Sequence, residues 1–210
     1  YKLIMQVDDY LLRHVMNIFN ETAVGVCEGQ QTDMEFETCD DVHIDEYINM
    51  IRLKTAVLLG GALKIGAVIG GAKDHDATLL QTFGEQLGIA FQLQDDILDV
   101  YGDPEKFGKQ VGGDILSNKK SFLLIKAFEL ADDKQAVELR RWFSGTHFDA
   151  KEKIDAVTGI YDQLNIRHHA WDAMRTYADK AFAALDSISL PGSHKQYLRD
   201  FADGLMIREN

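Results

Sequence analysis

The stretch FQLQDDILDVYGD, residues 91–103, places four aspartates within nine positions, at 95, 96, 99 and 103. Charges of one sign repel one another at such short spacings on a helix and cost stability. Apolar residues nevertheless surround these acids, with GIAF before them and IL and VY between them. Gln92 and the first three aspartates are spaced at i, i+3, i+4 and i+7, so a helix would bring them onto one face.

Two interpretations of this acidic face compete. It could be a solvated face that ends in a helix cap. It could instead be a cluster of hard oxygen ligands, which suits Mg²⁺, because that ion binds a few carboxylates, keeps several waters and often contacts substrate phosphate. Phe91, Ile97 and Leu98 require burial on the adjoining faces, which favours the metal site. Its ligands would be Asp95, Asp96 and Asp99.

Composition excludes several classes of protein. A chain of 210 residues with 46% hydrophobic and 27% charged residues is long enough for one globular domain. The net charge of -12 argues against a nucleic-acid partner, because phosphate backbones require a basic face. The two cysteines lack CxxC spacing, so a reduced, cytoplasmic setting is expected. The most apolar run, residues 56–72, contains Lys64 and falls short of the roughly 20 residues that a membrane span needs.

The sequence predicts an all-α fold. It contains only two prolines, and alternating runs of β-branched and aromatic residues are absent. Helices are expected at residues 2–33 (with a possible break), 46–72, 77–100, 118–131, 134–144, 150–162, 166–186 and 193–207. The second of these contains five glycines, which would be costly in an exposed helix and therefore predict very close packing of neighbouring helices. These are Gly60, Gly61, Gly66, Gly70 and Gly71.

Lysines accompany the acids. Lys109 and Lys119 lie in or just after a glycine-rich segment that follows the acidic stretch, and Lys54 and Thr55 interrupt the otherwise apolar stretch MIRLKTAVLLGG. A lysine within an apolar helix either reaches to the surface or points at an anion. Carboxylates for a metal together with lysines for an anion indicate a diphosphate site, where the lysines would stabilise a negatively charged leaving group.

These residues resemble a known family. GIAFQLQDDILDVYGD is similar to the second aspartate-rich region of the trans-isoprenyl diphosphate synthases (polyprenyl synthetases), in particular the short-chain enzymes that make farnesyl or geranylgeranyl diphosphate. Three further motifs occur in the family's order: GQxxD as GQQTDM (29–34), the Lys-Thr helix as YINMIRLKTAVLL (47–59), and GKxxGxD as FGKQVGGDILSNKKSFLL (107–124). The likeness is strongest between about residues 15 and 130.

The resemblance implies a fold and a reaction. The fold is isoprenoid synthase-like, an orthogonal bundle of long helices around a central cavity, and the family forms homodimers. The reaction is the prenyltransferase step of isoprenoid biosynthesis. An allylic diphosphate loses its diphosphate with the help of Mg²⁺, isopentenyl diphosphate attacks the resulting cation, and a proton is lost to give a short-chain prenyl diphosphate.

The resemblance also implies roles for individual residues. Asp95 would be the main metal ligand, Asp99 would act nearby through water, and Asp96 completes the expected ligand set. The other implied site residues are Lys54, Lys109 and Lys119 for the allylic diphosphate, Thr55 and Gln92 near the departing oxygen and the cation, Gln30 and Asp33 from GQxxD, and Phe91 in the hydrophobic wall.

The sequence departs from the family's pattern before GQxxD. The family has a first aspartate-rich motif there, followed by paired arginines, whereas VDDYLL (7–12) has Leu12 where an acid is needed. We therefore expect residues 1–210 to be one domain that lacks its N-terminal helices, and the chain alone not to turn over. The alternatives are a non-catalytic regulatory relative and an all-α terpene cyclase. The intact DDxxD and lysines argue against the first, and GQxxD with the Lys-Thr pair argues against the second.

Overall fold

The computed structural model describes residues 1–39, 41–103, 111–145 and 148–206, and regular structure in these ranges is helical. The elements are η1 (Ile4–Gln6), α1 (Asp9–Phe36), α2 (Ile44–Ile51), the π-helical turn η2 (Arg52–Ala56), α3 (Val57–Ile69), α4 (Asp74–Tyr101), α6 (Gly113–Leu116), α7 (Phe122–Leu130), α8 (Asp133–Ser144), α9 (Ala150–Gln163), α10 (Ile166–Asp186) and α11 (Gly192–Met206). The predicted all-α fold is confirmed.

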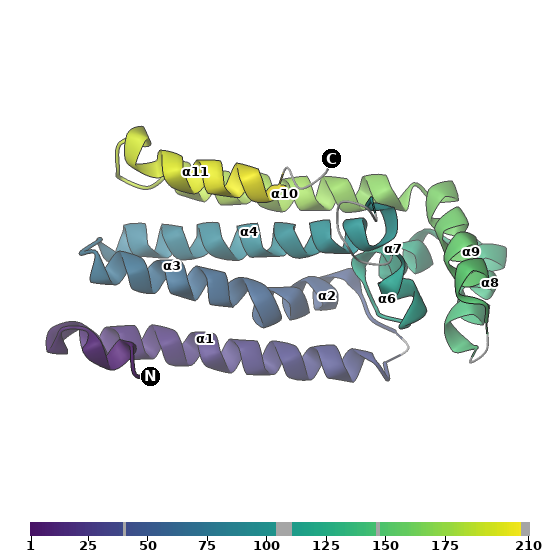
Figure 1. Ribbon diagram of the computed structural model, residues 1–210, viewed down its shortest axis with the longest axis horizontal. Coiled ribbons are helices and arrows are strands. Elements are labelled where there is room, and N and C mark those ends of the chain that lie inside the picture. The colour runs from purple at the N-terminus through teal and green to yellow at the C-terminus, as the bar shows by residue number, and fades with distance from the viewer. Residues whose placement is uncertain (40, 104–110, 146–147, 207–210) are drawn as a thin grey trace.

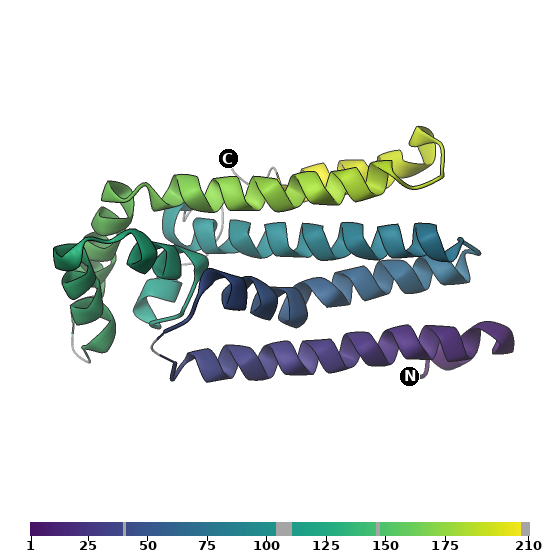
Figure 2. The ribbon, with the colours of Figure 1, turned by 180° about the vertical axis from the view of Figure 1, so that it is seen from behind.

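The long helices lie side by side along the long axis of the molecule (Figures 1 and 2). Helix α3 packs between α1 and α4, and α10 covers the other side of α4. The shorter helices α6 to α9 gather at the end where the acidic stretch of α4 terminates (Figure 1). Because α4 contacts helices on both sides, apolar residues such as Phe83, Leu87 and Leu93 are buried along it.

The structure differs from the predicted helices at two places that matter for function. The helix predicted at 46–72 is interrupted by the π-helical turn η2, which separates α2 from α3. The helix predicted at 118–131 begins only at Phe122, because Asn118 adopts a left-handed conformation with φ of 57° and the short helix α6 precedes it. Hydrophobic periodicity does not distinguish a π turn from an α-helix, since the two differ by one residue in their hydrogen-bond pattern.

Glycines allow the backbones of three helices to approach closely. A Cβ on Gly29 of α1 would lie 2.2 Å from the backbone nitrogen of Lys54, and a Cβ on Gly88 of α4 would lie 2.7 Å from Cα of Ala56. The expectation of close packing is confirmed for Gly60, whose Cβ would lie 2.8 Å from the carbonyl oxygen of Gln81. It is confirmed for Gly61 but not for Gly66, which has nothing within 4 Å.

Among the described residues, none of the helices is both long enough and apolar enough to span a membrane.

The glycine contacts lead to a test of the packing. We expect Gly29→Ala in the intact protein to lower the free energy of unfolding by about 1–3 kcal/mol, because the added methyl group meets backbone that cannot rotate away. Gly66→Ala is the matched control, an exposed helical glycine with open space around it, and should raise stability by about 0.5–1 kcal/mol. Urea unfolding followed by circular dichroism measures both. Equal effects of the two substitutions would contradict the packing argument.

Candidate functional site

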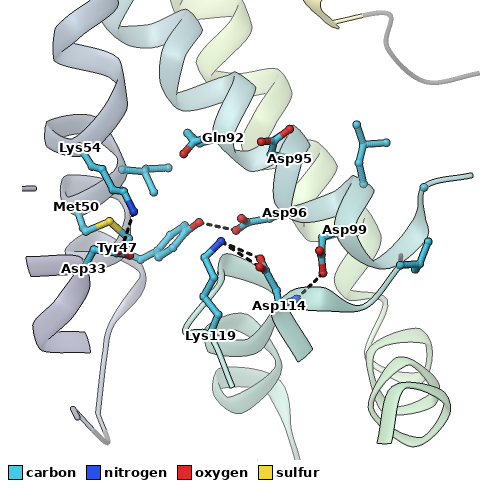
Figure 3. Close-up of a pocket in the computed structure, with 14 residues that line it drawn as sticks. Asp33, Tyr47, Met50, Lys54, Gln92, Asp95, Asp96, Asp99, Asp114 and Lys119 are labelled. Carbon is cyan, nitrogen blue, oxygen red and sulfur yellow. Dashed lines mark hydrogen bonds and ion pairs between the residues drawn. The ribbon is translucent and has the colours of Figure 1, made fainter. Parts of the chain in front are cut away.

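A pocket of about 220 Å³ opens beside the C-terminal half of α4 (Figure 3). It lies between α1, α2 and η2 on one side and α4 on the other, and α6 with the segment after it contributes to its lining. Its lining residues are Asp33, Tyr47, Met50, Ile51, Lys54, Gln92, Asp95, Asp96, Leu98, Asp99, Gly102, Val111, Asp114 and Lys119. Charged and amide side chains from separate helices therefore converge on one space.

The π turn presents Lys54 and Thr55 to opposite neighbours. The ammonium group of Lys54 donates to Oδ2 of Asp33 on α1 at 2.6 Å (Figure 3). The hydroxyl of Thr55 donates to Oε1 of Gln92 on α4 at 3.2 Å. Single π turns within α-helices are frequent at functional sites, because the wider turn changes the direction of the side chains. Here the turn connects the predicted Lys-Thr pair to both walls of the pocket.

Asp95 and Asp99 lie one helical turn apart on the face of α4 that lines the pocket (Figure 3). The backbone nitrogen of Asp114 donates to Oδ2 of Asp99 at 2.9 Å, which joins the start of α6 to α4. Burial raises the pKa of the Asp99 carboxyl above its ordinary value, and the hydrogen bond from Asp114 opposes this rise. Asp95 is the more exposed of the two.

Asp96 has a different environment from its neighbours. Only 5% of it is exposed, and its Oδ2 accepts hydrogen bonds from the Tyr47 hydroxyl at 2.6 Å and from the backbone nitrogen of Phe122 at 2.9 Å. Burial raises the pKa of this carboxyl to about 7, although attraction from Lys119 and the two hydrogen bonds oppose the rise. Asp96 thus ties α4 to α2 and α7, and its predicted role as a metal ligand stays a prediction.

Lys119 enters the pocket from the segment between α6 and α7. Its ammonium group lies 3.0 Å from Oδ2 of Asp114 (Figure 3). Burial lowers the pKa of Lys119, but attraction from Asp114 and Asp96 outweighs it, so that the pKa is raised above the ordinary value. The lysine therefore carries its positive charge at neutral pH. Together with Lys54 it gives the pocket two cationic groups from distant parts of the chain.

The structure brings together most of the residues predicted from the sequence, but not all. Among those that do not line the pocket, Gln30 is exposed on α1, and Thr55 and Phe91 are partly buried. Lys109 lies outside the described residues. The residues predicted from the sequence that do line it are Asp33, Lys54, Gln92, Asp95, Asp96, Asp99 and Lys119.

Sequence reasoning misses the contribution of Tyr47, and it identifies Asp114 as a motif residue without giving it a role in the site. Asp114 belongs to the GKxxGxD motif, which could have assigned it a place beside Lys119. Tyr47 lies 49 positions from its partner Asp96, and nothing in the local sequence predicts that hydrogen bond.

The oxygen ligands of this pocket suit Mg²⁺ that is shared with a phosphate-bearing substrate. In the part of the chain that the structure describes, no three His, Cys, Asp or Glu side chains lie close enough to enclose a metal ion by themselves. Mg²⁺ is usually held by one or two carboxylates, waters and substrate phosphates rather than by a complete protein cage. Asp95 and Asp99 on one pocket face fit that arrangement, and Lys54 and Lys119 offer cations to the same phosphates.

Comparison with known proteins gives a consistent result. The family model described as polyprenyl synthetase matches residues 1–161. The chain is 36% identical over 190 residues to a geranylgeranyl diphosphate synthase of Sulfolobus acidocaldarius, covering 88% of this chain and 57% of the relative. It is 37% identical to a geranylfarnesyl diphosphate synthase of Natronomonas pharaonis, covering 89% of this chain and 52% of the relative.

A solved structure shares both the fold and much of the sequence. A crystal structure of a geranylgeranyl pyrophosphate synthase superposes with a TM-score of 0.92 and 41% identity, covering 100% of this chain and 65% of that one. The chain thus spans less than two thirds of the length of these relatives.

The buried Asp96 leads to a second test. We expect Asp96→Ala in the intact protein to lower the free energy of unfolding by about 2–5 kcal/mol, because it leaves the Tyr47 hydroxyl and the Phe122 nitrogen buried without an acceptor. Tyr47→Phe removes only one donor and should cost about 1–2 kcal/mol. Chemical denaturation of the two variants decides the point. A loss for Asp96→Ala no larger than that for Tyr47→Phe would show that Asp96 does not join the three helices.

Proposed function

This chain belongs to the polyprenyl synthetase family, and from that premise we propose that the whole protein is a Mg²⁺-dependent trans-prenyltransferase. It would condense isopentenyl diphosphate with an allylic diphosphate to a short-chain prenyl diphosphate. The single observation that carries the proposal is the convergence of Lys54, Gln92 and Asp95 on one pocket. The proposal concerns the whole protein, since the chain spans 57% of the Sulfolobus relative.

The two lysines would bind the diphosphate of the allylic substrate. Lys54 and Lys119 lie against Asp33 and Asp114, so each ammonium group is already oriented before a substrate arrives. Because the lysines are cationic, they would attract phosphate oxygens and stabilise the charge that develops on the leaving diphosphate. Asp95 and Asp99 would hold Mg²⁺, which when bound would neutralise part of the same charge.

Gln92 would act on the opposite charge. Its Oε1 accepts a hydrogen bond from Thr55, which fixes the direction of the amide at the pocket wall. A carbonyl dipole held in this way would stabilise the positive charge of an allylic cation, because it requires no reorganisation when the charge develops. Thr55 would then serve the reaction through Gln92, since it does not itself line the pocket.

The relatives named above are prenyl diphosphate synthases, which favours elongation over a regulatory subunit or a terpene cyclase. From the family resemblance we also propose that the whole protein is a cytoplasmic homodimer. Light scattering on the purified protein tests the dimer.

The activity itself is tested with the intact protein. We expect it to form a prenyl diphosphate from isopentenyl diphosphate and an allylic diphosphate in the presence of Mg²⁺, with product measured by mass spectrometry. EDTA should stop the reaction, and added Mg²⁺ should restore it. The described carboxylates do not enclose the ion by themselves, so Mg²⁺ would be held together with waters and substrate phosphates and would be open to removal by a chelator. Product formation that chelation leaves undiminished would remove the metal from the mechanism.

Two aspartates of the opening stretch should differ in their effect. Asp95 lines the pocket, whereas Asp103 is exposed beyond the end of α4 at Tyr101. We expect Asp95→Ala to lower turnover at least about 100-fold, or about 2.7 kcal/mol of transition-state stabilisation. Asp103→Ala should cost less than about tenfold, or about 1.4 kcal/mol. Steady-state rates at saturating Mg²⁺ measure both, and equal losses would show that the metal ligands are wrongly assigned.

A further inference from the structure

Helix α9 contains a buried lysine that the mechanism above does not use. Lys153 is only 5% exposed, and its ammonium group donates a hydrogen bond to Oδ1 of Asn118. The same group lies 4.8 Å from the ring centroid of Phe143 on α8, a distance at which cation and ring attract each other. Burying a cation is costly unless it gains such partners, so the position of Lys153 indicates a specific role.

The partner of Lys153 is the residue that turns the chain toward the pocket. Asn118 has φ of 57°, in the left-handed region that few residues other than glycine adopt and that asparagine tolerates. The next residue is Lys119, whose backbone nitrogen donates to the carbonyl oxygen of Asp114 at 3.0 Å. Its ammonium group lies 3.0 Å from Oδ2 of the same aspartate. The conformation of Asn118 therefore determines where Lys119 enters the pocket.

The residue after Lys153 supports the other end of the same segment. Gly112 has φ of 85°, and a Cβ there would lie 2.7 Å from Cδ1 of Ile154. Across the segment, the backbone nitrogen of Gly112 donates to the carbonyl oxygen of Asp99 at 2.6 Å. Residues 112–119 are thus held between α4 on one side and two consecutive residues of α9 on the other.

We propose that Lys153 is a positioning residue, which fixes the left-handed turn at Asn118 and so holds Lys119 in place for the substrate's diphosphate. This inference rests on the proposed function, in which Lys119 contacts that diphosphate. Lys153 does not line the pocket, so its effect is transmitted through Asn118 and Lys119.

Two substitutions remove the same hydrogen bond from opposite ends. Lys153→Met keeps a long apolar stem in the core and removes the donor. Asn118→Gly removes the acceptor and keeps a residue that adopts positive φ without strain. The matched control is Lys151→Met, which removes an exposed lysine from the first turn of the same helix.

We expect Lys153→Met and Asn118→Gly in the intact protein each to weaken binding of inorganic diphosphate, with Mg²⁺ present, by about tenfold. Isothermal titration calorimetry measures this binding, and kcat/KM for the allylic diphosphate should fall by a similar factor. The Lys151→Met variant should bind inorganic diphosphate with the affinity of the wild type. In a Lys119→Ala background, adding Lys153→Met should change the affinity less than about twofold, because the two residues act in one chain of contacts.

The outcomes separate the inference from the function on which it rests. A wild-type protein that neither binds diphosphate nor forms product overturns the proposed function, and the positioning role with it. An active wild type whose Asn118→Gly variant binds diphosphate normally overturns the positioning role alone. If Lys153→Met lowers the affinity for diphosphate equally in the wild-type and the Lys119→Ala backgrounds, the positioning role is also overturned, because Lys153 would then only stabilise the fold. If Lys153→Met unfolds, Asn118→Gly decides, since it leaves the α9 core intact.

Discussion

The close contact of two helices with the π turn at residues 52–56 is the constraint on which the pocket depends. Gly29 of α1 and Gly88 of α4 lie against the backbone of this turn. A Cβ added to Gly29 would lie 2.2 Å from the nitrogen of Lys54, and one added to Gly88 would lie 2.7 Å from Cα of Ala56, so a larger side chain at either position would move the helices apart. Four residues after each glycine, one helical turn further, comes a polar partner of the turn: Asp33 for Lys54 and Gln92 for Thr55. The packing that fits the helices together therefore also sets the two polar contacts that orient the pocket.

The environment of each carboxylate explains how the chain accommodates four aspartates beside an apolar wall. Asp95 and Asp99 line the pocket, whereas Asp96 is buried and accepts two hydrogen bonds. Asp103 lies beyond the helix and is exposed. Lys119 attracts Asp96 and is itself paired with Asp114, which reduces the net negative charge around the acids. The repulsion expected from the sequence is lowered because the four groups occupy different surroundings.

Local patterns predict the parts of this structure that depend on neighbours in sequence. The all-α fold and the shared pocket face of Asp95 and Asp99 follow from helical periodicity, and the positions of Lys54 and Lys119 were found through motifs. The bond between Tyr47 and Asp96 could not be predicted, because its partners are 49 positions apart in the chain. The π turn could not be predicted because hydrophobic periodicity does not distinguish it from an α-helix. Gln30 shows the limit of a motif, since it matches GQxxD and yet does not line the pocket.

Both described lysines of the pocket are presented by irregular backbone rather than by a regular helix. Lys54 lies within a π turn, and Lys119 follows a left-handed residue. A regular helix fixes the directions of its side chains by its period, so it cannot adjust one of them alone. A wider turn or a residue with positive φ can redirect one side chain, but such conformations persist only where the surroundings hold them. Gly29 and Gly88 lie against the first irregularity, and Lys153 donates a hydrogen bond to Asn118 at the second. Residues outside the pocket thus hold the backbone from which each lysine extends, while Asp33 and Asp114 inside it orient the ammonium groups, so the packing around these turns is part of the site.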